Sequence, residues 1–153
     1  PELEDFKPAN SCRTSAFMQK DIVAITRIDD QLITNIRQLH GRTIGAVSGF
    51  SYGKNIIENQ AITIERVDNE QMNIKKLMSG RIDAIIGDRH ATIDAIKQAQ
   101  LQDKVRFDLN HPINSLDVFF VFQPDVTGEN RCTYVSEAIE KLRKNGTLAR
   151  LFD

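Results

Sequence analysis

The clearest pattern in the chain lies at residues 41–88, which read GRTIGAVSGF SYGKNIIENQ AITIERVDNE QMNIKKLMSG RIDAIIGD. Short runs rich in β-branched and apolar residues recur along this stretch, at residues 43–47, 61–67 and 82–86. The stretches between these runs have the composition and periodicity of helices. Strands that alternate with helices are typical of a parallel sheet with crossover helices, so we predict an α/β fold.

The second strand is followed by the helix with the clearest ends. Asp68 and Asn69 can cap its first turn, and Gly80 ends it. Its apolar side chains form a stripe typical of a helix that packs on a core: Met72, Ile74, Leu77 and Met78. The other elements predicted in this central block are a turn at 48–53, a short helix at 52–59, a helix at 88–100 and a strand at 105–109.

The flanks of the central block suggest two lobes. Residues 21–27 and 116–122 are both strand-like and apolar, and they could be neighbouring strands although the whole block separates them. Residues 28–111 would then form the ligand-binding lobe two, and residues 1–27 with 112–153 a partial lobe one. The second flank ends in an amphipathic helix at 129–144 and a turn or helix at 147–152, whereas residues 1–16 carry no readable pattern.

Composition excludes several classes of protein. The chain has 153 residues, 41% of them hydrophobic, which is enough for one packed domain or two small lobes. With 20 basic and 21 acidic residues and no basic block, nucleic acid is a poor partner. The longest apolar runs fall far short of the ~20 residues that span a bilayer, so we expect no membrane span. No signal peptide is visible at the start, as in a mature exported protein or a cytosolic one.

Two cysteines, Cys12 and Cys132, leave two alternatives open. An exported protein could pair them in a disulfide. Equally, they could be two unrelated buried thiols, because free cysteine is often buried.

In open α/β sheets, ligands bind beyond the carboxyl ends of the strands. The first strand is followed by the turn Ser48-Gly-Phe-Ser-Tyr-Gly53, which enters the short helix. Its glycines permit a tight turn, and free amides at the helix start, together with the Ser51 hydroxyl, favour an anion. The commoner use of such a serine is to cap its own helix.

Asp88 follows the third strand and would lie one strand away from this turn. It could equally cap the helix that starts there. A carboxylate beside an anion site nevertheless matches a ligand that carries both an ammonium and a carboxylate group. The combination of Ser51 and Asp88 therefore predicts a small α-amino acid as the ligand.

Motifs for catalysis are weak. The loop from Gly49 to Lys54 has three residues between its glycines and an asparagine after the lysine, so it does not match a phosphate-binding P-loop. His90 and Asp94 share a helix face, but no third metal ligand or nucleophile motif accompanies them. We expect no catalytic residue, no metal site and no cofactor, and hence no enzyme.

Three segments carry a family resemblance: LHGRTIGAVSGFS at 39–51, MSGRIDAIIGD at 78–88 and IEKLRKNGTLARLF at 139–152. In order and spacing the chain resembles the extracellular solute-binding proteins of family 3, the amino-acid receptors of ABC importers. The resemblance implies a periplasmic-binding-protein type 2 fold, a periplasmic or extracellular location and an ABC permease as partner. It also implies that Ser51 and the loop amides hold the ligand carboxylate, that Asp88 holds the α-ammonium, and that Gly49, Phe50 and Tyr52 lie beside the ligand.

The chain also departs from that family. Members have a longer N-terminal part that builds most of lobe one and supplies an aromatic wall and an arginine clamp, usually in a Thr-x-x-Arg context that Arg13 lacks. Phe50 stands where a small or hydroxyl residue is common. We therefore expect a complete lobe two with a truncated lobe one, weak affinity, and a second copy that covers the open site. The rival hypothesis is a ligand-sensing domain of a signalling or regulatory protein.

Overall fold

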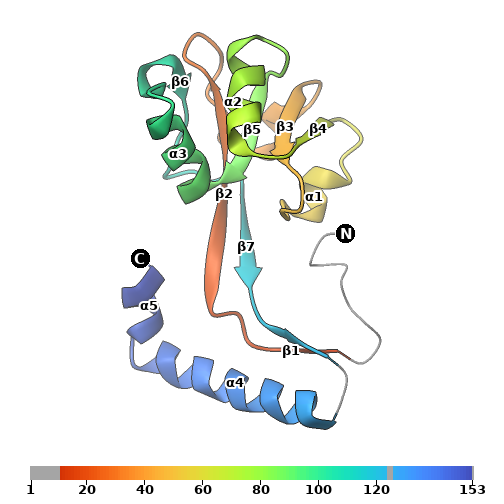
Figure 1. Cartoon of the computed structure of the whole chain (residues 1–153), viewed down its shortest axis with the longest axis vertical. Coiled ribbons are helices and arrows are strands. Elements are labelled where there is room, and N and C mark those ends of the chain that lie inside the picture. The colour runs from red at the N-terminus through yellow and green to blue at the C-terminus, as the bar shows by residue number, and fades with distance from the viewer. Residues whose placement is uncertain (1–10, 124–125, 153) are drawn as a thin grey trace. The chain divides into compact units, whose positions relative to one another are not determined.

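The computed structural model describes residues 11–123 and 126–152, and the chain in it divides into two compact units (Figure 1). One unit consists of residues 21–116. The other combines residues 11–20 with 117–152. The chain passes between the units twice, inside strands β2 (Met18–Arg27) and β7 (Asn114–Val118), which pair with each other. The predicted pairing of the two flanks is confirmed.

The 21–116 unit is built on a mixed sheet in the order β4-β3-β5-β2-β6. Its other strands are β3 (Thr43–Val47), β4 (Thr63–Val67), β5 (Ala84–Asp88) and β6 (Val105–Arg106). Strand β3 pairs in parallel with β4 and β5, as predicted, but β2 runs antiparallel to both β5 and β6. The predicted strand at 105–109 is reduced to the two residues of β6. It lies beside β2, because β2 occupies the edge of β5.

Helices connect these strands: η1 (Ile36–Leu39), α1 (Lys54–Ile57), α2 (Glu70–Met78), α3 (Arg89–Gln98) and η2 (Gln102–Lys104). The Asn69 side chain accepts a hydrogen bond from the Met72 amide at 3.0 Å, so the predicted cap of α2 is confirmed. Helix α1 is shorter than the predicted 52–59. Gly53 has a φ of +89°, outside the right-handed helical region, and the helix therefore starts only at Lys54.

Apolar side chains cover both faces of this sheet. Along β2, Ile22 and Ala24 join one core cluster, while Val23 and Ile25 join the other. The second cluster includes side chains from α2 and α3, and α1 contributes to the first. Burial on both faces explains why the central strands β2 and β5 contain continuous apolar runs, whereas β4 alternates.

The predicted apolar stripe of α2 is only half right. Its isoleucine and leucine lie in the core, but Met72 and Met78 are 40% and 38% exposed, and Asn73 is fully buried instead. Asn73 lies over Gly45 of β3, where an added Cβ would come within 2.3 Å of the Asn73 Oδ1. The close approach of helix and strand at a glycine turns Asn73, rather than the methionines, toward the sheet.

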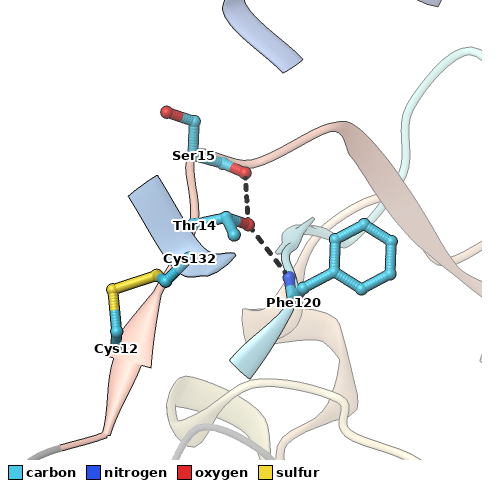
Figure 2. Close-up of a disulfide and its surroundings, with 5 residues drawn as sticks. All are labelled: Cys12, Thr14, Ser15, Phe120 and Cys132. Atoms are coloured by element: carbon cyan, nitrogen blue, oxygen red, sulfur yellow. Dashed lines mark hydrogen bonds between the residues drawn. A yellow bond between two sulfur atoms is a disulfide. The ribbon is translucent and has the colours of Figure 1, made fainter. Parts of the chain in front are cut away.

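In the other unit, strand β1 (Cys12–Arg13) pairs antiparallel with β8 (Val121–Phe122), and α4 (Val126–Lys144) is followed by α5 (Thr147–Phe152). The predicted strand at 116–122 is thus divided between β7 and β8. A disulfide joins Cys12 of β1 to Cys132 of α4 (Figure 2). Next to it, the Thr14 hydroxyl donates to the Ser15 carbonyl and accepts from the Phe120 amide. Of the two alternatives for the cysteines, the structure selects the disulfide.

A charged network stabilises the side of the 21–116 unit away from the loops after β3 and β5. The Arg27 guanidinium donates to the carbonyls of Leu77 and Ile82, at 3.1 and 2.9 Å. It also pairs with Asp30, which pairs in turn with Arg42. Burial opposes ionisation of Asp30, but the Gln31 amide and the two guanidiniums outweigh it and lower the pKa of this carboxyl.

The disulfide closes a loop of 120 residues, so its removal should release a large chain entropy in the unfolded state. We expect the double substitution Cys12→Ser and Cys132→Ser to lower the free energy of unfolding by about 3 to 5 kcal/mol, measured by urea unfolding. Reductant should destabilise the wild type equally and leave the double variant unchanged. Equal stability of the oxidised and reduced wild type would contradict this role.

Because its folded pKa is lowered, Asp30 should stabilise the fold above the ordinary value of 3.8, and this contribution should be lost as pH falls through the lowered pKa. At pH 7 we expect Asp30→Asn to cost about 1 kcal/mol, and the cost to shrink below pH 3.8. Thermal unfolding across pH measures both. Asp29→Asn, at an exposed neighbour, is the control; a loss independent of pH would rule out the ionic contribution.

Candidate ligand site at the strand ends

The candidate site lies where β3 and β5 end. The two strands are parallel neighbours, with Ile44 opposite Ala84 and Gly45 opposite Ile85. Their carboxyl ends therefore meet at one edge of the sheet, within the 21–116 unit. The loop at residues 48–53 leaves β3 there, and Asp88 is the last residue of β5.

Two glycines shape the loop. Gly49 and Gly53 have φ angles of +81° and +89°, which residues with a side chain rarely adopt. At Gly53 a Cβ would also come within 2.3 Å of the Asn114 Nδ2. Gly49 has open space around it, so its conformation alone requires glycine. The tight turn inferred from the sequence is present.

Tyr52, predicted to lie beside the ligand, points into the core. It is 2% exposed, and its hydroxyl accepts from the Val47 amide and donates to the Val47 carbonyl, at 2.9 and 3.3 Å. Burial raises the pKa of this phenol, against the opposing effects of the Val47 hydrogen bond and the Arg66 charge. The neutral phenol thus fastens the loop to the end of β3.

Ser51 has a buried hydroxyl without a partner. Its Oγ is exposed by less than 1 Å² and makes no hydrogen bond with any residue that the structure describes. It does not cap α1 either, because Gly53 occupies the N-cap position and no side chain bonds there. A buried hydroxyl left unsatisfied costs about 1–3 kcal/mol, so this position favours a polar partner from outside the chain.

The carbonyl groups of the loop are held by side chains that the sequence did not single out. Arg66 Nη1 donates to the carbonyls of Val47 and Phe50, and Asn114 Nδ2 donates to the Tyr52 carbonyl. In contrast, the amides of Gly49, Ser51 and Gly53 donate to no residue within 11–123 or 126–152. Only contacts across the sheet identify Arg66 and Asn114, since neither belongs to a local motif.

Asp88 caps α3. Its Oδ1 accepts from the amides of His90 and Ala91, both at 3.0 Å, which confirms the capping alternative. The carboxylate is also close enough to Tyr52 for its charge to contribute to the raised pKa of that phenol. The structure therefore brings Asp88 and the 48–53 loop into one neighbourhood.

Asp21 and Ser115 lie near Asp88 and were also missed from the sequence. Asp21 Oδ1 accepts from the Ser115 hydroxyl at 2.7 Å, and Asp21 Oδ2 lies 3.5 Å from Arg89 Nη1. Ile22, next to Asp21, is the strand partner of Asp88. Arg89, the residue after Asp88, is thus paired with Asp21.

The weak metal motif gains no support. Asp94 forms its ion pair with Lys97, at 3.7 Å, and His90 is exposed. Among the described residues, no three His, Cys, Asp or Glu side chains cluster closely enough to hold a metal ion.

Phe50, which was predicted to lie beside the ligand, belongs to the 48–53 loop and is 42% exposed.

Comparison with known sequences gives a consistent assignment. A family model described as NMT1/THI5 like matches residues 12–120. The probable amino-acid-binding protein YxeM of Bacillus subtilis is 30% identical over 148 residues, which are 95% of this chain and 52% of that protein. The chain therefore spans about half the length of this curated relative.

Solved structures show the same fold. An ArgBP mutant from T. maritima aligns with a TM-score of 0.66 at 14% identity, over 92% of this chain and 59% of that one. The GluR0 ligand-binding core from Nostoc punctiforme, in complex with L-glutamate, aligns with a TM-score of 0.64 at 18% identity, over 93% and 63%. The fold of type 2 periplasmic binding proteins and the resemblance to solute-binding proteins are confirmed, and the chain belongs to the NMT1/THI5-like family.

Proposed function

We propose that this chain is the ligand-holding part of a solute-binding protein, and that it binds a small α-amino acid where β3 and β5 end. The observation that carries the proposal is the buried Ser51 hydroxyl. It has no partner among the described residues, and in the same loop the amides of Gly49, Ser51 and Gly53 also lack one there. Such a set of donors matches a carboxylate. Asp88, at the end of the neighbouring strand, supplies the opposite charge for an ammonium group.

Each predicted site residue has its own part in this proposal. Ser51 and the amides around Gly49 and Gly53 receive the carboxylate, and Asp88 receives the ammonium. The exposed ring of Phe50 offers apolar contact beside Ser51. Tyr52 fixes the loop to the end of β3 from the core side, since its hydroxyl is bonded to Val47.

The relatives support binding and uptake rather than catalysis. YxeM is named a probable amino-acid-binding protein, and one fold neighbour, with a TM-score of 0.62, is the substrate-binding protein of an amino-acid ABC transporter. We extend this to an ABC permease as partner. The curated relative gives no support to the alternative, a signalling domain.

The disulfide supports a location outside the cytosol. Cys12 and Cys132 form a disulfide. Disulfides persist in oxidising compartments and are rare in the cytosol. None of the helices between residues 11 and 152 that the structure describes is long and apolar enough to cross a bilayer. We therefore propose a periplasmic or extracellular protein.

A second copy is the further partner that we propose, through the unit formed by 11–20 and 117–152. Phe17 stacks on Phe120 at 4.7 Å between ring centroids and lies 5.9 Å from Phe152. Phe120 and Phe152 are 49% and 47% exposed, and Leu151 is 67% exposed. Grouped apolar surface of this kind favours association.

A thermal-shift screen of the twenty amino acids tests the proposed ligand. At least one should raise the melting temperature, and Asp88→Asn should abolish the shift, because asparagine keeps the helix cap but loses the charge. Ser51→Ala should weaken binding about tenfold or more. Asp94→Asn, on the exposed face of α3, is the control. Stabilisation that survives Asp88→Asn would remove the ammonium site.

Light scattering at micromolar concentration tests the second copy. We expect a dimer for the wild type and a monomer for Phe120→Ser, because the substitution removes a half-exposed ring of the apolar group. Tyr134→Ser, at a ring 74% exposed on α4, is the matched control and should stay dimeric. A wild type that is only monomeric contradicts this partner.

A further inference from the structure

We infer that Arg66 and Asn114 are positioning residues that preset the 48–53 loop for an anion. The inference rests on the proposed function, because it concerns how the same loop is held. Both side chains reach the loop from strands distant in sequence, Arg66 from β4 and Asn114 from β7. Neither was expected from local sequence.

Arg66 ties the end of β3 to the loop. It lies opposite Ala46 in the strand register, and a single nitrogen, Nη1, donates to the Val47 carbonyl at 3.1 Å and to the Phe50 carbonyl at 3.3 Å. Its guanidinium carbon also lies 5.3 Å from the centroid of the Tyr52 ring. One guanidinium thus contacts the start, the middle and the anchor of the loop.

Asn114 holds the far end of the loop. Its Nδ2 donates to the Tyr52 carbonyl at 3.0 Å and to the Asn55 Oδ1 at 3.1 Å. A Cβ at Gly53 would overlap this nitrogen at 2.3 Å, so the glycine makes room for the contact. The loop is therefore held from two strands.

These bonds determine where the amides point. In a trans peptide the carbonyl and the following N–H point in opposite directions. A Phe50 carbonyl directed at Arg66 therefore turns the Ser51 amide away from Arg66. By the same geometry, Asn114 turns the Gly53 amide away from itself. Both amides lack a partner among the residues described, and Ser51 adds its unpartnered hydroxyl.

Donors that are already oriented bind an anion without the cost of ordering the loop. Charge alone is the competing explanation for Arg66, because any cation nearby attracts a carboxylate. Asn114 separates the two explanations, since it is neutral. Lysine at position 66 separates them again, because it keeps the charge but not the planar guanidinium that spans two carbonyls.

The test is an amide NMR titration of the whole chain with sodium acetate, a carboxylate without an ammonium group, at constant ionic strength. In the wild type we expect saturable shifts at Gly49, Ser51 and Gly53. Arg66→Met and Asn114→Ala should each weaken the binding at least tenfold. Arg66→Lys should recover only part of it. Arg106→Met, on the opposite edge strand β6, should match the wild type.

The spectra without acetate give a second readout that no ligand affects. Loss of either positioning residue should move the Ser51 and Gly53 amide resonances, whereas Arg106→Met should not. If the wild type binds acetate but Asn114→Ala binds equally well, or Arg66→Lys equals the wild type, the positioning roles are wrong and the proposed function stands. If acetate never saturates, the carboxylate site fails, and the ligand-free spectra alone decide the positioning: unchanged loop resonances in both variants would overturn it.

Discussion

The antiparallel pairing of β2 with β5 is the contact on which the rest of the 21–116 unit depends. Backbone hydrogen bonds join Ile22 to Asp88 through Ile25 to Ile85, and they place β2 beside a sheet that is otherwise parallel. Successive side chains of these strands then point alternately into the two cores. A slip of one residue would move each side chain to the opposite face, into a core that it was not shaped to fill. The packing of both core clusters therefore depends on this register.

The same register builds the candidate site. Because Ile22 pairs with Asp88, its neighbour Asp21 lies where it can bind Arg89 and Ser115. Asp88 itself has a structural duty as the cap of α3, and its two amide bonds fix the direction of the carboxylate. In the proposed site, the side chain that caps the helix would also recognise the ligand. Substitutions there must therefore keep the cap if they are to report on binding.

Much of the fold could be predicted from local patterns. The strand at 43–47, the Asn69 cap and the pairing of the two flanks follow from apolar periodicity and capping chemistry, both of which act over short distances or on whole strands. Periodicity failed where a backbone contact intervened. Asn73 is buried because Gly45 lets helix and strand approach closely, and the strand at Val105 pairs with β2 because β2 occupies the edge of β5.

Local patterns were enough to predict the α/β class, the order of the central elements and the positions of Ser51 and Asp88 at the ends of neighbouring strands, because strand ends and helix starts can be read locally. The contacts of those positions come from tertiary packing. The Arg66 and Asn114 bonds join residues 16 to 62 positions apart, and the disulfide joins residues 120 apart. Tertiary packing also turns Tyr52 inward, because its hydroxyl bonds to Val47 at the buried end of β3. From the sequence alone, Tyr52 was expected beside a ligand. Contacts of this range depend on how strands pair, and pairing is a property of the folded chain.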